Sequence, residues 1–533
     1  MEIIKRSIFP LLLVSGLVTV TACAGETPSP ETEGNQTEQA ESVQMPEQQA
    51  QAENENAYQS VPYRLYPVSE NAWVGDVMPM VDGDRLQLYY LYDTDQNGAG
   101  YHPIYKFSTT DFCEYQDDGL VIPYGDSADD PDLAVGTGCV LKAQDGRYHC
   151  FYTGHNDSFP EKGLDRECVM HAVSDDNINW TKIPEDTFYA AENYSGDDFR
   201  DPFVFWNEDE QCYWLLIAAR EESLGGVVAR YTSTNLSEWT LCEPLYAPEK
   251  QYMLECPDLF LLGDKYYLFY SWDCVTYYAM SDSIYGPFTE PENNVLDGTG
   301  FSFYAAKTAE FNGVRYLCGW VGRKASMTDA GTYDWAGNLL IHELVQKEDG
   351  RLGVKEPSNL QDYFGLAESP AAVATVGDVQ EGDNSYTLSA DGENFAFVDF
   401  GMRKPEILLE CTVLLEKDGC AGFAFGKGDE YNRYIGLTLD AKNNHVRFDG
   451  TALERTGNTA SANTTDFTFE PGEEYHVKLI MENEIAILYI DDTKALSNRI
   501  YKSLNGAHWG LFTKNSKADF GDVKIRLPES LSD

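Results

Sequence analysis

A unit of about fifty residues recurs five times between Pro62 and Pro357, and this repeat constrains the fold more than any other feature of the chain. Each copy has an aromatic-rich segment followed, after a loop, by a Ser-containing segment and a polar turn. The aromatic-rich segments are Leu86–Tyr92, Tyr148–Gly154, Tyr213–Ile217, Tyr266–Tyr270 and Arg315–Trp320. Aromatic residues favour strands, and helical periodicity is nearly absent. Several short strands per repeat are typical of propeller blades, so we expect a five-bladed β-propeller over residues 59–357.

The sequence changes character after residue 357. A passage richer in Gly, Pro and Ala, residues 358–384, is interpreted as a linker. Beyond it, alternating segments separated by Gly, Asp and Asn turns predict an antiparallel β-sandwich over 385–533. The segments are Ile407–Leu415, Gly422–Phe425, Tyr434–Leu439, His445–Phe448, Tyr475–Met481, Ile485–Ile490, Trp509–Thr513 and Asp522–Leu527. The expected fold class is all-β, with a structural or accessory sandwich; sugar binding by the sandwich is the alternative.

The first residues have the features of an export signal. Lys5 and Arg6 precede an apolar run from Ile8 to Val20, which is too short and wrongly flanked for a membrane span. The run ends in Val20-Thr21-Ala22-Cys23, which resembles the lipobox of bacterial lipoproteins. This resemblance implies a signal peptide over 1–22 and lipidation of Cys23, which would hold the protein on the extracellular face of the bacterial membrane. A plain secretory signal with an incidental cysteine is the alternative.

Residues 23–58 are rich in Glu, Gln, Thr, Pro and Ala and contain no Lys or Arg. Such a segment buries too little apolar area to offset its ordering entropy, so we expect a disordered acidic tether. The net charge of -50 excludes nucleic acid and anionic membrane surfaces as partners, because both would repel the protein. Removing Cys23 leaves eleven cysteines, an odd number that excludes a complete disulfide framework within one chain.

Three acidic residues occupy corresponding positions in the repeats. Asp76, Asp201 and Glu255 each lie at the start of the strand expected to be innermost in its blade. Innermost strands line the central channel of a propeller, so these three carboxylates should meet at one mouth of the channel. Hydrolysis of a glycosidic bond needs two carboxyl groups, and a third carboxylate can stabilise the positive charge of the transition state. Metal binding is the competing use of three acids, but there is no Asp-rich calcium loop and no companion His; we expect neither metal nor cofactor.

The motifs around these acids resemble a known family. Trp73–Asp76, Phe199–Pro202 and Glu255–Asp258 are similar to the three signature motifs of glycoside hydrolase family 32, which includes invertases, levanases, inulinases and related β-fructofuranosidases. Further segments that resemble the family are Gly136–Val140, Tyr152–Gly154, Phe303–Ala305 and Trp335–Asn338. The resemblance covers about residues 62–357, and a five-bladed propeller followed by a sandwich is also the architecture of that family.

The resemblance implies a role for each residue in its motifs. Asp76 would be the nucleophile, Glu255 the acid/base and Asp201 the stabiliser of the transition state, in a retaining reaction through a fructosyl-enzyme intermediate. The substrate would be sucrose, a fructo-oligosaccharide, levan or inulin. The substrate-binding residues that follow from the resemblance are Trp73, Asp93, Thr137, Arg200, Tyr304 and Trp335.

Several positions depart from the family pattern. Gly75 stands where the family has Asn, Val77-Met78 separates the nucleophile from Pro79, and Ser302 stands where the family has Asp. Asp93 replaces a Gln; an ionised Asp only accepts hydrogen bonds, and would add negative potential that disfavours phosphorylated sugars unless it turns away into the following loop. The catalytic acids therefore match while the sugar-recognising residues differ. A propeller hydrolase for another furanoside and a non-catalytic sugar-binding lipoprotein are the alternatives.

Overall fold

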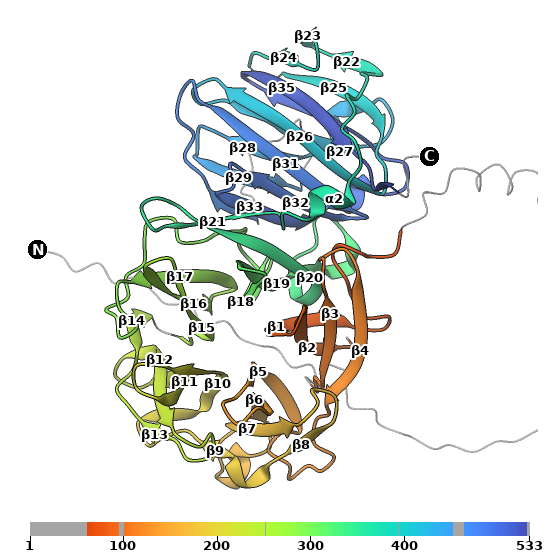
Figure 1. The fold of residues 1–533 in the computed structure, drawn as a ribbon. Helices are drawn as coiled ribbons and strands as arrows, with labels where there is room; N and C mark the ends of the chain where they lie inside the picture. The colour runs from red at the N-terminus through yellow and green to blue at the C-terminus, as the bar shows by residue number, and fades with distance from the viewer. Residues whose placement is uncertain are drawn as a thin grey trace, which may run out of the picture. The chain divides into compact units, whose positions relative to one another are not determined.

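The chain from Trp73 to Lys355 is built from four antiparallel β-sheets (Figure 1). The computed structural model describes residues 61–94, 101–250, 252–392, 394–450, 453 and 463–529. The predicted signal peptide, the acidic tether and Cys23 lie outside these residues. Within them, no helix is long and apolar enough to cross a membrane.

An eight-stranded sheet joins the first and the last strands of this region. Its strand order is β18-β19-β20-β1-β2-β3-β4, and β21 also pairs with β20. The strands are β1 (Trp73–Asp82), β2 (Arg85–Asp93), β3 (Ile104–Thr109), β4 (Tyr115–Ile122), β18 (Tyr304–Phe311), β19 (Val314–Lys324), β20 (Tyr333–Gln346) and β21 (Leu352–Lys355). The two halves meet through the pairing of Val74 with Gly337. The beginning and the end of the region are therefore neighbours, as the first and last blades of a propeller are.

Three further sheets follow the chain between β4 and β18. The first contains β5 (Ala134–Lys142), β6 (Tyr148–His155), β7 (Glu167–Ser174), β8 (Trp180–Lys182) and β9 (Phe188–Tyr189). The second contains β10 (Tyr194–Asn207), β11 (Cys212–Glu221), β12 (Gly225–Ser233), β13 (Thr240–Leu241) and β14 (Tyr246–Lys250), and the third contains β15 (Glu255–Leu262), β16 (Lys265–Trp272) and β17 (Val275–Ser281). The predicted all-β class is confirmed. The count of five blades stays a prediction, because hydrogen bonding joins the first and last strand groups into one sheet.

The C-terminal region consists of two seven-stranded antiparallel sheets. One has the order β22-β25-β34-β27-β28-β29-β30 and the other β23-β24-β35-β26-β31-β32-β33. The strands are β22 (Ala374–Val376), β23 (Asp378–Glu381), β24 (Tyr386–Ser389), β25 (Phe395–Met402), β26 (Glu406–Leu415), β27 (Cys420–Gly426), β28 (Ile435–Asp440), β29 (His445–Asp449), β30 (Thr464–Asp466), β31 (Glu474–Glu482), β32 (Ile485–Ile490), β33 (Lys494–Arg499), β34 (His508–Lys514) and β35 (Lys517–Arg526). Buried apolar side chains from both sheets, such as Leu409, Phe423, Leu437 and Leu488, form one core. This is the predicted sandwich.

The predicted linker, residues 358–384, is too long. It contains the short helix α2 (Leu360–Tyr363) and the strands β22 and β23, which belong to the two sandwich sheets. Both strands are short and contain no buried residue, so they lack the alternating apolar pattern that identifies a half-buried strand. The sandwich therefore begins about ten residues before the predicted boundary at 385. Short 3-10 helices lie at Pro160–Lys162, Pro184–Asp186, Ala325–Met327, Tyr431–Arg433 and Tyr501–Ser503.

The first strand of each of the five sequence repeats contains a β-bulge. The register shifts lie between Gly75 and Met78 in β1, Gly136 and Gly138 in β5, Arg200 and Phe203 in β10, Glu255 and Asp258 in β15, and Tyr304 and Lys307 in β18. Four of the bulges hold a non-glycine residue at positive φ, namely Asp76 (22°), Asp201 (63°), Cys256 (54°) and Ala305 (53°). A bulge re-aims side chains out of the regular alternation, and such strained residues cluster at functional sites. The five bulges therefore indicate the position of the functional site.

A buried arginine of the sandwich reaches into the edge of the propeller, and the two domains belong to the same compact unit. Arg499, at the end of β33, is 1% exposed. It donates hydrogen bonds to the main-chain carbonyls of Gly322 (2.8 Å) and Val321 (3.2 Å) on β19 and to the side-chain oxygen of Asn338 on β20. Its charge is paired with Glu484 at 2.6 Å.

Candidate active site

Hydrogen bonds tie the bulges of β1, β5, β10 and β15 into a continuous belt. The Thr137 hydroxyl donates to the Asp76 carbonyl (3.1 Å), and the Thr153 hydroxyl donates to the Thr137 carbonyl (3.0 Å). The main-chain N–H of Asp201 donates to Thr153 Oγ1 (2.8 Å), and the N–H of Cys256 donates to Asp201 Oδ2 (2.9 Å). The strands β1, β10 and β15, which lie far apart in the sequence, therefore bring Asp76, Asp201 and Glu255 to one site. Glu255 immediately precedes Cys256 in β15. We call Asp76, Asp201 and Glu255 the carboxylate triad.

Thr137 connects the bulge of β5 to that of β1. It is 1% exposed, and its hydroxyl donates its proton to the main chain of Asp76. A hydroxyl has a single proton to donate, so this contact helps to position the strand that carries Asp76. Substrate binding by Thr137 stays a prediction.

Asp76 is held in surroundings that disfavour its charge. Burial, followed by repulsion from Asp201, raises its pKa to about 7, although a hydrogen bond from Trp320 opposes the shift. That bond joins the indole Nε1 to Asp76 Oδ1 at 3.1 Å. Repulsion from Glu255 raises the pKa of Asp76 further, and Lys307 lowers it. The surroundings thus destabilise the ionised form of Asp76, which favours its conversion into a neutral ester.

Asp201 shares these surroundings. Burial and then repulsion from Glu255 raise its pKa to about 6, and the cations Arg200 and Lys307 act in the opposite direction. Lys307 on β18 is 2% exposed, and its ammonium donates to the carbonyl of Gly138. Sequence reasoning missed Lys307; the available signal was a single cation inside the apolar segment Tyr304–Phe311.

Glu255 has a hydrogen-bond donor on each carboxylate oxygen. Its Oε1 accepts from Arg200 Nε (3.2 Å) and Nη2 (2.9 Å), and its Oε2 accepts from the hydroxyl of Tyr304 (2.5 Å). Repulsion from Glu255 contributes to the raised pKa values of Asp76 and Asp201, so the three carboxylates interact electrostatically. Two donors from different strands fix the orientation of this side chain, as an acid/base residue requires.

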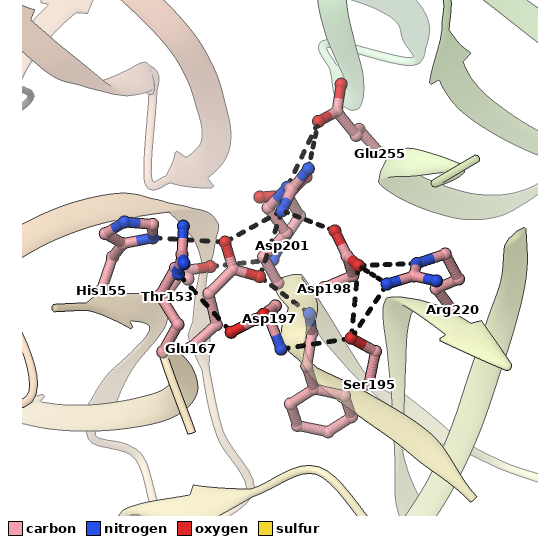
Figure 2. Close-up of polar contacts among 12 residues, drawn as sticks. Thr153, His155, Glu167, Ser195, Asp197, Asp198, Asp201, Arg220 and Glu255 are labelled. Carbon is pink, nitrogen blue, oxygen red and sulfur yellow. Dashed lines mark hydrogen bonds and ion pairs between the residues drawn. The ribbon is translucent and has the colours of Figure 1, made fainter. Parts of the chain in front are cut away.

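Arg200 is held between two carboxylates, those of Glu167 and Glu255, which are labelled in Figure 2. Its Nη1 lies 2.9 Å from Glu167 Oε1, and Glu167, which is 3% exposed, also accepts from the N–H of Phe199 at 2.7 Å. Attraction to Glu167 and Glu255 outweighs burial and raises the pKa of Arg200. Substrate binding by Arg200 stays a prediction; in the structure its guanidinium donates to Glu255. No local pattern singles out Glu167, because its partner Arg200 lies 33 residues away.

The departure at Gly75 has a steric cause. A Cβ atom at this position would lie 2.3 Å from the ring of Trp335. The Trp335 ring in turn lies 6.0 Å from that of Trp320, which holds Asp76. The ring of Trp335 therefore fills the space that the side chain of the expected asparagine would need. Together with Trp320 it forms an aromatic wall next to Asp76. Trp73 lies opposite Asp93 in the β1–β2 register, and its ring faces the guanidinium of Arg323 at 5.9 Å.

Asp93 is paired with an arginine and lies near a histidine. Its Oδ2 lies 2.5 Å from Arg323 Nη1, and its Oδ1 lies 3.5 Å from His102 Nε2. Arg323 offsets the charge of Asp93, so the expectation that Asp93 adds negative potential to the site is corrected. A carboxylate that only accepts hydrogen bonds does require a cation or hydroxyl opposite it, and Arg323 supplies the cation.

Two further features concern cysteine and metal chemistry. The eleven cysteines in the described part of the chain are all free. Among the same residues, no group of three His, Cys, Asp or Glu side chains is arranged to hold a metal ion. The carboxylate triad is instead surrounded by the donors named above, which suits acid/base and nucleophilic chemistry.

Residues 69–356 match the family described as the glycosyl hydrolases family 32 N-terminal domain. The chain belongs to glycosyl hydrolase family 32. Curated relatives include the sucrose-6-phosphate hydrolase of Escherichia coli, 25% identical over 52% of this chain and 61% of that protein. The levanbiose-producing levanase of Bacillus subtilis (strain 168) is 20% identical over 86% of this chain and 89% of that protein. The chain spans little more than half the length of the first relatives it matches.

Solved structures of family 32 members share the fold. The sucrose-6-phosphate hydrolase from Lactobacillus gasseri superimposes with a TM-score of 0.68 at 18% identity, covering 90% of this chain and 95% of that one. The exo-inulinase from Aspergillus awamori gives a TM-score of 0.66 at 16% identity, covering 89% and 99%. The family 32 fold of a propeller followed by a sandwich therefore extends over both domains.

Proposed function

We propose that the protein is a β-fructofuranosidase that hydrolyses its substrate with retention of configuration. The observation that carries the proposal is the carboxylate triad: Asp76, Asp201 and Glu255 lie on equivalent bulges and have different electrostatic surroundings. Family 32 relatives named as invertase, levanase and sucrose-6-phosphate hydrolase support the substrate class.

The proposed reaction has two steps. Glu255, protonated, donates its proton to the leaving oxygen while Asp76 attacks the anomeric carbon and forms an ester. Glu255 then removes a proton from water, which attacks the same carbon and releases Asp76. Asp201 stabilises the positive charge that develops on the sugar ring in both steps. Conversion of the Asp76 anion into an ester removes its repulsion with Asp201, which favours the first step.

We also propose the finer features of the architecture. The eight-stranded sheet comprises the first and fifth blades of a five-bladed propeller, joined at Val74 and Gly337. Cleavage before Cys23 and lipidation of its thiol would place the protein on the extracellular face of the membrane, with residues 23–58 as a tether. Globomycin-sensitive processing and labelling with a fatty-acid analogue, lost in Cys23→Ser, would test this anchoring.

A hydrolase for a different furanoside is the second candidate. It is favoured by the pairing of Asp93 with Arg323 and by the indole above Gly75, because both change the groups that would face the sugar. A purely sugar-binding protein is disfavoured, since binding alone does not need a nucleophile paired with an oriented acid/base.

The deciding experiment is reducing-sugar release from sucrose, kestose, inulin, levan and arabinan. We expect cleavage of at least one fructoside, with the β-anomer of the released sugar appearing first in time-resolved NMR. Asp76→Asn is the matched inactive control. Cleavage of arabinan alone would favour the second candidate, and initial release of the α-anomer would contradict retention.

A further inference from the structure

An exposed tyrosine next to the acid/base is fixed at both ends. The hydroxyl of Tyr252 accepts a hydrogen bond from Arg200 Nη2 (3.0 Å), the same nitrogen that donates to Glu255 Oε1 (2.9 Å). Its main chain packs directly on β12, because a Cβ at Gly226 would lie 1.8 Å from the Tyr252 carbonyl oxygen. The side chain is nevertheless 49% exposed. A large ring that is immobilised without being buried is a preorganised binding surface.

The position of this ring indicates which part of the substrate it meets. The acid/base must lie within hydrogen-bond reach of the leaving oxygen, so the leaving sugar lies against Glu255. The phenol oxygen of Tyr252 and the carboxylate oxygen of Glu255 share one donor nitrogen. Tyr252 therefore borders the space that the leaving sugar occupies, and its ring offers a face for the C–H groups of that sugar.

The charges around this space are paired and carry an excess of carboxylates (Figure 2). Arg200 contacts Glu167 and Glu255 as described above. The other arginines of the cluster are engaged as well: Arg220 with Asp198, and Arg166 with Asp157 and Asp197. A phosphate here would have to displace a carboxylate from an arginine and would be repelled by the acids that remain.

We infer that Tyr252 forms the binding surface for the leaving group, and that this subsite takes a neutral sugar rather than a phosphorylated one. The inference rests on the proposed function and refines it. The same surface would bind a sugar acceptor that competes with water: its hydroxyl attacks the anomeric carbon, the bond to Asp76 breaks, and Glu255 takes the proton.

The test compares Tyr252→Ala and Tyr252→Phe with wild type on the neutral fructoside that wild type cleaves best. We expect Tyr252→Ala to raise KM about 5- to 10-fold, while Tyr252→Phe, which keeps the ring, stays within about twofold. With added glucose, the ratio of transfer to hydrolysis should fall in Tyr252→Ala by a similar factor. Tyr285→Ala is the matched control, because Tyr285 is also 49% exposed but packs on Trp214, away from the triad.

The outcomes separate this inference from the proposed function. If wild type cleaves no fructoside, the proposed function fails. If wild type is active and Tyr252→Ala has the same KM and transfer ratio, the leaving-group subsite is wrong while the function stands. For the charge argument, wild type should have a kcat/KM for sucrose at least about tenfold above that for sucrose 6-phosphate. Equal values, or a preference for the phosphate, would overturn it.

Discussion

The Asp76 side and the Glu255 side of the carboxylate triad are held in opposite ways. Burial raises the pKa values of Asp76 and Asp201, and repulsion by Asp201 on Asp76 and by Glu255 on Asp201 raises them further. Glu255 is clamped between a guanidinium and a phenol. The surroundings of Asp76 and Asp201 thus disfavour their ionised forms, whereas the hydrogen bonds to Glu255 fix the orientation of its carboxylate. Different surroundings thus suit these carboxylates to the different roles proposed for them, nucleophile and proton donor.

The largest expected effect comes from removing either member of the displacement pair. Asp76→Asn and Glu255→Gln should each lower kcat by about three to five orders of magnitude, because each removes one partner of the double displacement. Steady-state kinetics on the best fructoside measures this, with circular dichroism as the folding control. Near wild-type turnover in Asp76→Asn would remove the nucleophile assignment and with it the contrast between the two sides.

The clamp on Glu255 gives the next largest effect. Glu167→Gln removes the charge that holds the far end of Arg200, so kcat should fall about tenfold with KM nearly unchanged. The matched control is Asp198→Asn, whose carboxylate pairs chiefly with Arg220. An unchanged kcat in Glu167→Gln would show that Tyr304 alone orients the acid/base.

The pH dependence tests the nucleophile side. Asp76 must be ionised to attack, and its pKa is raised to about 7. The rate constant kcat/KM should therefore increase as pH rises through about 6–7, rather than through the ordinary range near 4 for Asp. A pH profile of kcat/KM in salt-matched buffers measures this increase. An increase centred near pH 4 would mean that Asp76 is better solvated than its surroundings indicate.

The smallest effect is on stability. The folded-state pKa of Asp76 is raised, so between about pH 4 and 7 the folded protein binds more protons than the unfolded chain, and stability falls as pH rises. Asp76→Asn removes that dependence and should stabilise the protein by about 1–2 kcal/mol at pH 8, with little change at pH 4. Thermal unfolding of both proteins at the two pH values measures the difference. A destabilised Asp76→Asn at pH 8 would contradict the picture of an unfavourable anion.

The sequence made the acids predictable because each stands at the start of a repeated unit. Asp76, Asp201 and Glu255 could be aligned by position alone, and the aromatic strands β2, β6, β11, β16 and β19 were predicted from their composition. In the sandwich, the alternating segments gave β26–β29, β31, β32, β34 and the second half of β35. Short or polar strands such as β22 and β23 have no such pattern and were missed.

Contacts between residues on different blades could not be predicted from local sequence patterns. Lys307 lowers the pKa values of Asp76 and Asp201, and Glu167 and Tyr252 contact Arg200. No local pattern near Lys307, Glu167 or Tyr252 indicates these contacts. Arg323 lies 230 residues from Asp93, and its positive charge offsets that of the acid. Trp335 likewise explains Gly75 only once the fold has closed the chain on itself.

Arg499 bears on how this enzyme could be taken apart. Excising the sandwich would remove the donor for two main-chain carbonyls of β19 and for the side chain of Asn338, directly behind the aromatic wall. Each buried acceptor left without a donor costs about 1–3 kcal/mol. In a chimera that joins this propeller to a foreign C-terminal domain, these acceptors would be buried without a donor unless the new domain also supplied a guanidinium at the same place. The propeller and the sandwich are thus connected by a buried polar contact that a replacement domain would have to reproduce.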